Sequence, residues 1–225
     1  MIHFYKYHGA GNDFVLIDDR SEKFNIDNTE LVASMCDRHF GIGADGLMLV
    51  RNHDELDFEM IYYNSDGRQS SMCGNGGRCI VAFAYELGMI TEKCTFMAID
   101  GKHEAIVESK SSISLEMIDV SEIEVISENA LLLDTGSPHY VERRSNIQDI
   151  NIISEARKIR YNDRFSENGV NVNFVELKDG ILNIRTYERG VEDETLACGT
   201  CVTAAAIAMN YWGETAETIA VKAVG

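Results

Sequence analysis

The sequence predicts a mixed α/β fold of the α+β kind, built from two related domains. Short strand-like runs bounded by turn residues fill most of the chain, and helix-like segments are few. The 225 residues suffice for two domains of about a hundred residues each. A Cys-Gly pair opens an apolar, small-residue helix twice, at Cys73 and at Cys198. The second opening repeats the first, which favours two copies of one unit.

Turn residues divide the first half of the chain into strands and two helices. Asn28 or Thr29 can cap a helix that Gly41 ends, and Gly88 ends the second helix. A turn at 64–67 closes a run rich in aromatic and β-branched residues. The predicted elements are strands at 2–8, 13–19 and 56–63, helices at 28–39 and 74–87, and three short antiparallel strands within 94–118.

The acidic stretch 119–130 is the predicted domain boundary. It gives an N-terminal domain over 1–118 that carries Cys73 and a C-terminal domain over 119–225 that carries Cys198. In the second domain, Lys178-Asp179-Gly180 joins two alternating runs as a hairpin. The predicted elements are strands at 130–134, 138–143, 170–177 and 181–188, and helices at 151–159 and 199–212.

An ungapped shift of the chain by 125 positions aligns residues at a strand end, a helix entry and a helix exit. It places Tyr62 on Tyr187, Cys73 on Cys198, Gly74 on Gly199, and Gly88 on Gly213. Repeated units usually pack about a pseudo-twofold axis. We therefore expect both helix N-termini to face a shared cleft.

The charge balance excludes several classes of partner. A formal charge of −17, from 37 acidic and 20 basic residues, repels phosphate backbones and anionic lipids. No apolar run approaches the length of a membrane span, and the N-terminus has no signal-peptide pattern. We expect no nucleic-acid partner, no membrane partner, and a cytoplasmic location.

Five of the six cysteines fall into two groups. Without a signal peptide they are expected to be reduced thiols, and Cys36, Cys79 and Cys94 lie in patterns typical of buried apolar residues. Cys73 and Cys198 instead precede helices, where unpaired amides and the helix dipole favour the thiolate. This position predicts reactive cysteines.

Two such thiols suit proton transfer at a carbon beside a carboxylate. The amides of Gly74, Asn75, Gly199 and Thr200 would bind that carboxylate and the negative charge that develops on it. One thiolate removes the proton and the other thiol returns one to the opposite face, which inverts the centre without metal or cofactor. The sequence thus predicts racemase or epimerase chemistry with a small-molecule substrate.

Other polar residues have both a functional and a structural interpretation. Glu188 would bind a substrate ammonium and Arg189 a carboxylate, but such a pair at a strand end is most often solvated. Asn64 suits a turn, and His139, beside a proline, suits a structural role. The residues alone leave these alternatives open.

Six motifs occur in order along the chain: HGAGNDF (8–14), DRHFGIGADGL (37–47), NSDGRQSSMCGNGGRC (64–79), TGSPH (135–139), NVNFVE (171–176) and YERGVEDETLACGT (187–200). Together they resemble the diaminopimelate epimerase family, and the resemblance runs the whole length of the chain. It implies a pyridoxal-phosphate-independent interconversion of LL- and meso-2,6-diaminoheptanedioate, a step toward lysine and peptidoglycan. It also implies two pseudo-symmetric domains, each a mixed sheet curled around a central helix, and a homodimer without cofactor.

The resemblance also implies residue roles. Cys73 and Cys198 would be base and acid, Glu188 would hold the reacting ammonium, and His139 would support catalysis. The reacting carboxylate would be held by Gly74, Asn75, Gly199 and Thr200. The distal end of the substrate would be recognised by Asn12, Asn64, Asn171 and the Arg189 side chain.

Three positions and the chain end depart from the family pattern. Ser137 replaces an asparagine that would contact substrate, and Gly46 replaces a glutamine found in many members. Cys201 replaces a glycine and creates Cys198-Gly-Thr-Cys201. The chain also stops before the family's last strands, so the second domain is expected to be C-terminally incomplete relative to the family.

The departures leave alternatives to the epimerase. Related racemases of proline or hydroxyproline would need no recognition of a second ammonium and carboxylate. Cys198 and Cys201 could instead form a disulfide or bind metal in a thiol-redox or metal-binding domain, although a second cysteine pair at such spacing is absent and no metal site is predicted. A non-catalytic binding module is the third option.

Overall fold

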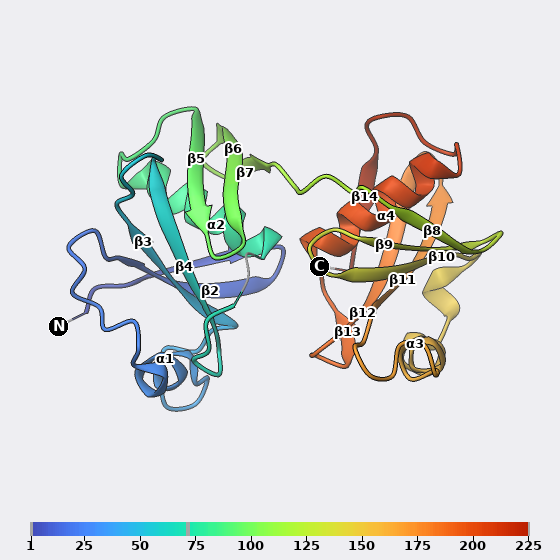
Figure 1. Cartoon of the computed structure of the whole chain (residues 1–225), viewed down its shortest axis with the longest axis horizontal. Helices are drawn as coiled ribbons and strands as arrows, with labels where there is room; N and C mark the ends of the chain where they lie inside the picture. Colours follow the sequence, from blue (N-terminus) through green and yellow to red (C-terminus); the bar gives the residue numbers. More distant parts are fainter. Residues whose placement is uncertain (1, 71–72, 225) are drawn as a thin grey trace. The chain divides into compact units, whose positions relative to one another are not determined.

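A computed structural model describes residues 2–70 and 73–224 and shows two compact units. Unit 1 spans Met1–Glu116 and unit 2 spans Met117–Gly225. Each consists of a curled mixed sheet and two α-helices, so the predicted fold class is confirmed (Figure 1). Within the described residues, no helix is both long and apolar enough to cross a membrane.

Unit 1 is a seven-stranded sheet whose strands follow chain order. The pairs β2–β3 and β4–β5 are parallel, and the helices α1 and α2 make these two crossovers. The strands are β1 (Tyr5–Gly9), β2 (Asn12–Asp18), β3 (Gly46–Arg51), β4 (Phe58–Asn64), β5 (Lys93–Ala98), β6 (Gly101–Ser109) and β7 (Ser112–Leu115), and the helices are α1 (Thr29–Cys36) and α2 (Gly74–Glu86).

The helix α2 is the centre of unit 1. It contacts both β1 and β7, the first and last strands of the order, because the sheet curls around it (Figure 1). Its apolar residues, among them Ile80 and Phe83, pack against Phe14, Met48 and Phe58 of the sheet. Burial of this apolar area stabilises the unit and fixes where the N-terminus of α2 lies.

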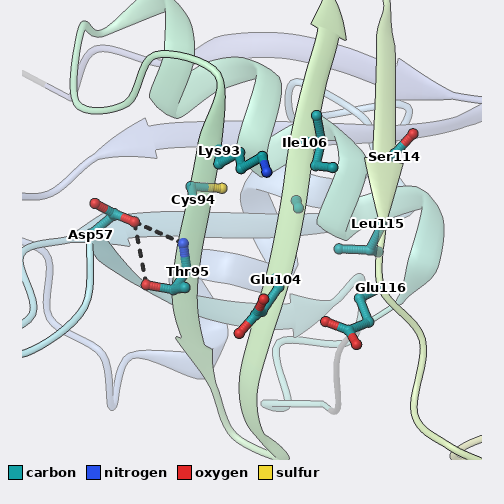
Figure 2. Close-up of a pocket in the computed structure, with 10 residues that line it drawn as sticks. Asp57, Lys93, Cys94, Thr95, Glu104, Ile106, Ser114, Leu115 and Glu116 are labelled. Carbon is teal, nitrogen blue, oxygen red and sulfur yellow. Dashed lines mark hydrogen bonds between the residues drawn. The ribbon is translucent and has the colours of Figure 1, made fainter.

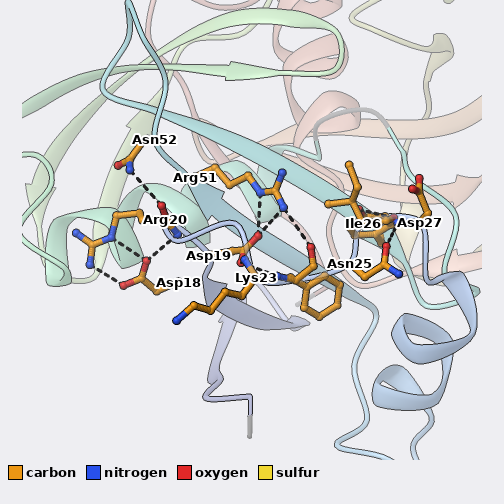
Figure 3. Close-up of polar contacts among 11 residues, drawn as sticks. Asp18, Asp19, Arg20, Lys23, Asn25, Ile26, Asp27, Arg51 and Asn52 are labelled. Atoms are coloured by element: carbon orange, nitrogen blue, oxygen red, sulfur yellow. Dashed lines mark hydrogen bonds and ion pairs between the residues drawn. The ribbon is translucent and has the colours of Figure 1, made fainter.

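The central strand β3 is not among the predicted elements. Five of its six residues are buried, because α2 covers one face and α1 the other, so the strand has no alternating pattern. Its C-terminal residue Arg51 donates to the buried carboxylate of Asp19 at 2.7 and 2.8 Å (Figure 3). This ion pair closes the end of the sheet opposite Asn12.

Unit 2 is built on the strand order β13-β12-β11-β10-β9-β8, with β14 added beside β12. The pairs β10–β11 and β12–β14 are parallel, and α3 and α4 make those crossovers. The elements are β8 (Ile123–Ser127), β9 (Ala130–Asp134), β10 (Pro138–Arg143), the 3₁₀-helix η1 (Ile147–Asp149), α3 (Ile152–Arg160), β11 (Asn171–Lys178), β12 (Ile181–Glu188), β13 (Asp193–Thr195), α4 (Gly199–Tyr211) and β14 (Ala220–Lys222).

The two units repeat one path of the chain. The chain from β1 to β5 corresponds to the chain from β9 to β14, with β13 as an addition. In both, the successive strand pairs are antiparallel, parallel, antiparallel and parallel, and an α-helix makes each parallel crossover. Phe14 pairs with Gly46, and His139 pairs with Asn171 in the same way. The strand pair β2–β3 therefore corresponds to β10–β11 at the predicted shift of 125 positions.

The predicted match of Tyr62 to Tyr187 is wrong by one residue. Met48 pairs with Tyr62, whereas its counterpart Asn173 pairs with Thr186. Tyr62 therefore corresponds to Thr186, and Tyr187 corresponds to Tyr63. The connection from β12 to α4 is one residue longer than that from β4 to α2, which restores the match at the two cysteines.

Candidate functional site

Cys73 and Cys198 occupy the same position in the two units. Each is the N-cap residue of a 13-residue helix, with extended backbone angles of −101° and 129° for Cys73 and −128° and 122° for Cys198. A glycine follows each one, and neither first turn, as described, contains an acidic residue. The first-turn amides and the dipole therefore present positive potential to an anion beside each sulfur.

In unit 1, Asn12 and Asn75 contact each other. The Asn75 side-chain amide donates to Asn12 Oδ1 at 2.6 Å, and Asn12 Nδ2 donates to Asp45 Oδ2 at 3.2 Å. Arg78 also donates to Asn75 Oδ1. Asn75 is 1% exposed. These bonds attach the start of β2 to the first turn of α2 and fix both amides.

Gly46 and Asn64 lie directly opposite each other in β3 and β4. A Cβ at Gly46 would come within 2.5 Å of the Tyr63 carbonyl oxygen and 2.6 Å of the Tyr62 ring. A longer side chain, such as a glutamine, needs Tyr62 to move. Glycine is therefore required by the packing here, while Asn64 remains exposed at the strand end.

In unit 2, Ser137, His139 and Asn171 form one hydrogen-bonded group. His139 Nε2 lies 3.1 Å from Ser137 Oγ, and Asn171 Nδ2 donates to the same oxygen at 3.0 Å. His139 is fully buried, and burial lowers its pKa to about 3, with the charge of Arg189 adding to the effect. The imidazole is therefore neutral at physiological pH.

Two further residues, Asn173 and Thr186, extend this hydrogen-bonded group from the Nδ1 side of His139. Asn173 Nδ2 lies 3.4 Å from His139 Nδ1 and donates to the Tyr140 carbonyl at 3.2 Å, while Asn173 Oδ1 accepts from Thr186 Oγ1 at 2.9 Å. His139 Nδ1 is thus the acceptor and Nε2 carries the hydrogen. Ser137 Oγ accepts from two donors, which directs its own hydrogen elsewhere.

Sequence reasoning did not select Asn173 or Thr186. A usable signal was present, because Asn171 and Asn173 are two residues apart in one strand and share a face. Paired asparagines on the face of a central strand are unusual for an apolar core.

Glu188 is the last residue of β12, and Arg189 follows it; the two side chains have different surroundings. Burial raises the pKa of the Glu188 carboxyl, which a cation would reverse. The Arg189 amide donates to Asn171 Oδ1 at 2.9 Å. The exposed guanidinium of Arg189 donates to the Asn168 carbonyl at 3.0 Å. The β12 end is thereby joined to Asn171 and Ser137.

The thiols differ in their environments. Burial raises the pKa of Cys36 and of Cys94 to about 11 and that of Cys79 to about 12, which agrees with the predicted core roles. The pKa of Cys198 is lowered, chiefly by a hydrogen bond from the Cys201 side chain and against its burial. Thr200 lies in the first turn of α4. Its carbonyl accepts a hydrogen bond from Thr135 Oγ1 at 3.0 Å, which joins α4 to the loop before β10.

One recess of unit 1 contains none of the predicted site residues. It measures about 630 Å³ and is lined by residues of β5, β6 and β7 with Glu116 and Asp57, and the Asp57 carboxylate accepts from Thr95 N at 2.7 Å (Figure 2). A second recess lies beside Asp18 and Arg20 at the opposite end of the sheet from Asn12. Among residues 2–70 and 73–224, no three His, Cys, Asp or Glu side chains are grouped to hold a metal ion.

Comparison with known proteins shows which family this chain belongs to. The family model of diaminopimelate epimerase matches residues 4–121 and 131–225. The chain is 53% identical over 212 residues to a diaminopimelate epimerase of Flavobacterium psychrophilum, covering 94% of this chain and 82% of that one. It is 41% identical over 222 residues to the diaminopimelate epimerase of Aquifex aeolicus, covering 91% and 80%.

Solved structures share the fold at low identity. A PhzF-family phenazine biosynthesis protein of Enterococcus faecalis aligns with a TM-score of 0.69 and 13% identity, covering 99% of this chain and 86% of that one. A hydroxyproline epimerase of Agrobacterium vitis aligns with a TM-score of 0.63 and 16% identity, covering 95% and 78%.

Proposed function

Because this chain belongs to the diaminopimelate epimerase family, we propose that it is an isomerase that interconverts LL- and meso-2,6-diaminoheptanedioate. The observation that carries the mechanism is the equivalent placement of Cys73 and Cys198 at the N-caps of α2 and α4. Each unit supplies one thiol with an anion-binding helix turn beside it. The two thiols form the acid and base of a proton exchange at one carbon.

The reaction begins with one cysteine as thiolate and the other as thiol. The thiolate takes the α-proton, the electron pair of the C–H bond moves toward the carboxylate, and the opposing thiol delivers its proton to the other face. Charge and protons balance without an oxidant or cofactor. Amides of Gly74, Asn75, Gly199 and Thr200 stabilise the carboxylate as charge accumulates on it.

Glu188 and Ser137 orient the reacting amino acid. The desolvated carboxylate of Glu188 favours a cation, and its raised pKa supports an ammonium as that partner. Ser137 receives hydrogens from His139 and Asn171, so its own hydroxyl hydrogen is available for a carboxylate oxygen. His139 thus acts through Ser137 and holds it in place.

Recognition of the second amino-acid end is assigned to Asn12, Asn64, Asn171 and Arg189. An analogue that lacks this end leaves polar groups of the site without partners, at a cost of about 1–3 kcal/mol each. We also propose a cytoplasmic location and, as the resemblance implies, a homodimer, and light scattering in solution tests the oligomeric state.

Solvent deuterium exchange tests the proposed function. Incubation of the reduced protein with LL-diaminopimelate in D₂O should give the meso isomer with deuterium at the inverted carbon. Proline and hydroxyproline, under the same conditions, should gain no deuterium. Exchange into proline instead would move the activity to the related racemases, and no exchange into any of these amino acids would overturn the epimerase proposal.

A further inference from the structure

Arg189 is held against the segment 168–171, which ends at the first residue of β11. The Arg189 backbone amide donates to Asn171 Oδ1 at 2.9 Å, and guanidinium Nη1 donates to the Asn168 carbonyl at 3.0 Å. Gly169 stands between these two contacts. A Cβ on Gly169 would lie 2.6 Å from Arg189 Cδ and 2.8 Å from Arg189 Cγ. The aliphatic part of the Arg189 side chain therefore lies directly on the backbone of Gly169.

Arg160, the last residue of α3, packs against the same glycine. A Cβ on Gly169 would also lie 3.1 Å from Arg160 Cζ. Arg160 Nη1 donates to the Phe165 carbonyl at 3.1 Å, and Nε and Nη2 donate to Glu192 Oε1 at 3.1 and 2.9 Å. The Phe165 carbonyl accepts from the Gly169 amide as well, at 2.9 Å. Because these bonds fix both Arg160 and the backbone of Gly169, a side chain at position 169 has to displace Arg189.

Glu192 leaves the two guanidinium groups with different charge surroundings. Its carboxylate compensates the charge of Arg160, and it also accepts from the Gly190 amide at 3.3 Å and from the Tyr161 hydroxyl at 3.1 Å. In the part of the chain that the structure describes, no carboxylate forms an ion pair with Arg189. The positive charge of Arg189 therefore suits an anionic ligand.

We propose that Gly169 is a positioning residue that fixes the Arg189 side chain for the distal carboxylate of the substrate. This role rests on the proposed function, in which Arg189 recognises that carboxylate. With only hydrogen at position 169, the Arg189 stem crosses the backbone and its guanidinium reaches the Asn168 carbonyl. The side chain then has little motion to lose when the carboxylate binds. A Cβ at position 169 moves the stem away and releases the guanidinium.

Gly169→Asn and Gly180→Asn are a matched pair of variants for this proposal. Both glycines have a φ of +75°, but a Cβ on Gly180 would meet nothing within 4 Å. Asparagine tolerates positive φ better than most residues that have a Cβ, so the two variants share one backbone cost and differ in the contact with Arg189.

Steady-state kinetics with diaminopimelate measure the effect of that contact. Gly169→Asn should raise KM about tenfold and keep kcat within about twofold of the wild type, because the lost contact stabilises substrate and transition state alike. Gly180→Asn should keep both constants. A KM in Gly169→Asn equal to that of the wild type would overturn the proposal.

A double-mutant cycle shows whether Gly169 acts through Arg189. Arg189→Ala should raise KM about a hundredfold, because hydrogen bonds to a charged group are lost. Addition of Gly169→Asn to Arg189→Ala should raise KM no further, since the group that Gly169 positions is already absent. A second tenfold rise in the double variant would mean that Gly169 acts independently of Arg189, which contradicts the positioning role.

Nuclear magnetic resonance measures the position of Arg189 without substrate. In ¹⁵N-labelled protein, the Arg189 Nε–H signal is the one that disappears in Arg189→Lys. Its heteronuclear NOE should be close to the values of the β12 backbone amides in the wild type and in Gly180→Asn, and clearly lower in Gly169→Asn. A mobile Nε–H in the wild type would overturn the proposal even if Gly169→Asn does not fold. An equally rigid Nε–H in Gly169→Asn would overturn it as well.

The resonance measurement also separates this proposal from the proposed function. Wild-type protein that exchanges no deuterium into diaminopimelate, yet has a rigid Arg189 Nε–H that Gly169→Asn releases, would remove the function and leave Gly169 as the residue that holds Arg189. Wild-type protein that exchanges deuterium with a mobile Arg189 side chain would keep the function and remove the role of Gly169.

Discussion

The two units share one chain path but line the space beside their central helices with opposite chemistry. In unit 1 the strand residues at this level are Phe14, Met48 and Tyr62, and the Phe14 and Tyr62 rings meet edge to face with centroids 6.1 Å apart. Their counterparts in unit 2 are His139, Asn173 and Thr186, all buried.

The same difference appears on the helices. Gly76 of α2 lies against the Met48 side chain, whereas its counterpart in α4 is the fully buried thiol of Cys201. Buried polar groups are tolerated because they are connected, and each partly satisfied member would be costly. One fold thus accepts either lining, provided that the lining residues are all apolar or are hydrogen-bonded to one another.

Loss of either N-cap thiol should have the largest effect, because the units are proposed to contribute one proton-transfer group each. Cys73→Ala and Cys198→Ala should each lower kcat about a thousandfold, or ~4 kcal/mol in activation free energy, in an epimerase assay. Cys94→Ala, which alters a buried core thiol, is the control and should retain most activity. Wild-type turnover in either N-cap variant contradicts the pairing of the units.

A polar residue of the unit 2 lining, placed at the equivalent position of unit 1, should destabilise the protein. Met48→Asn introduces the residue of unit 2 among Phe14, Tyr62 and Gly76, which offer a new amide no connected set of partners. We expect a loss of about 3 kcal/mol in the free energy of unfolding, measured by urea denaturation. Met48→Leu, a volume-conserving swap, should cost less than about 1.5 kcal/mol. Similar values for both variants would show that unit 1 accepts a polar lining.

The buried imidazole of unit 2 should make stability depend on pH. Because the pKa of His139 falls from an ordinary histidine value to about 3 in the folded protein, the unfolded chain binds the extra proton between these values. Stability should therefore fall as the pH drops below about 6.5, by about 2 kcal/mol at pH 5 for this residue.

This dependence can be isolated by comparing unfolding free energies at pH 7 and pH 5. The difference between these two values should shrink in His139→Asn and persist in His39→Asn, which alters an exposed histidine. An unchanged difference in His139→Asn would mean that the imidazole of unit 2 is accessible to protons.

The smallest effect is expected for one hydroxyl of the polar lining. Thr186→Val preserves shape in β12 but leaves Asn173 Oδ1 without its donor, which should cost about 1 kcal/mol in thermal or urea unfolding. Thr95→Val removes an exposed hydroxyl bond to Asp57 and should cost less. Equal costs would show that the Asn173 carbonyl finds another donor, such as water.

Local signals predicted the central helices and missed several strands. The starts of α2 and α4 at Cys-Gly and their ends before Gly88 and Gly213 depend on caps and glycines that the sequence displays directly. The strand β3 has no alternation because both of its faces are buried. The strands β13 and β14 are three residues each, too short to give a pattern.

Site residues were predictable where a motif names them and not where contacts define them. Ser137, His139 and Asn171 were selected as single positions, and the structure brings them together. Asn173 and Thr186 were not selected, since their importance lies in bonds to each other and to His139. Cys201 was recognised as a departure, but its burial in the core of unit 2 depends on how α4 packs on the sheet.

The sequence by itself determined the two repeated units, the two helix-capping thiols and the family, because helix caps, turn glycines and motif spacing are properties of neighbouring residues. Tertiary structure alone decided which side chains share a hydrogen bond across strands. It moved the counterpart of Tyr62 from Tyr187 to Thr186, since the chain from Asn173 to its partner Thr186 is one residue shorter than the chain from Met48 to its partner Tyr62. Register and packing, which no short segment specifies, turned separate polar residues into one connected lining.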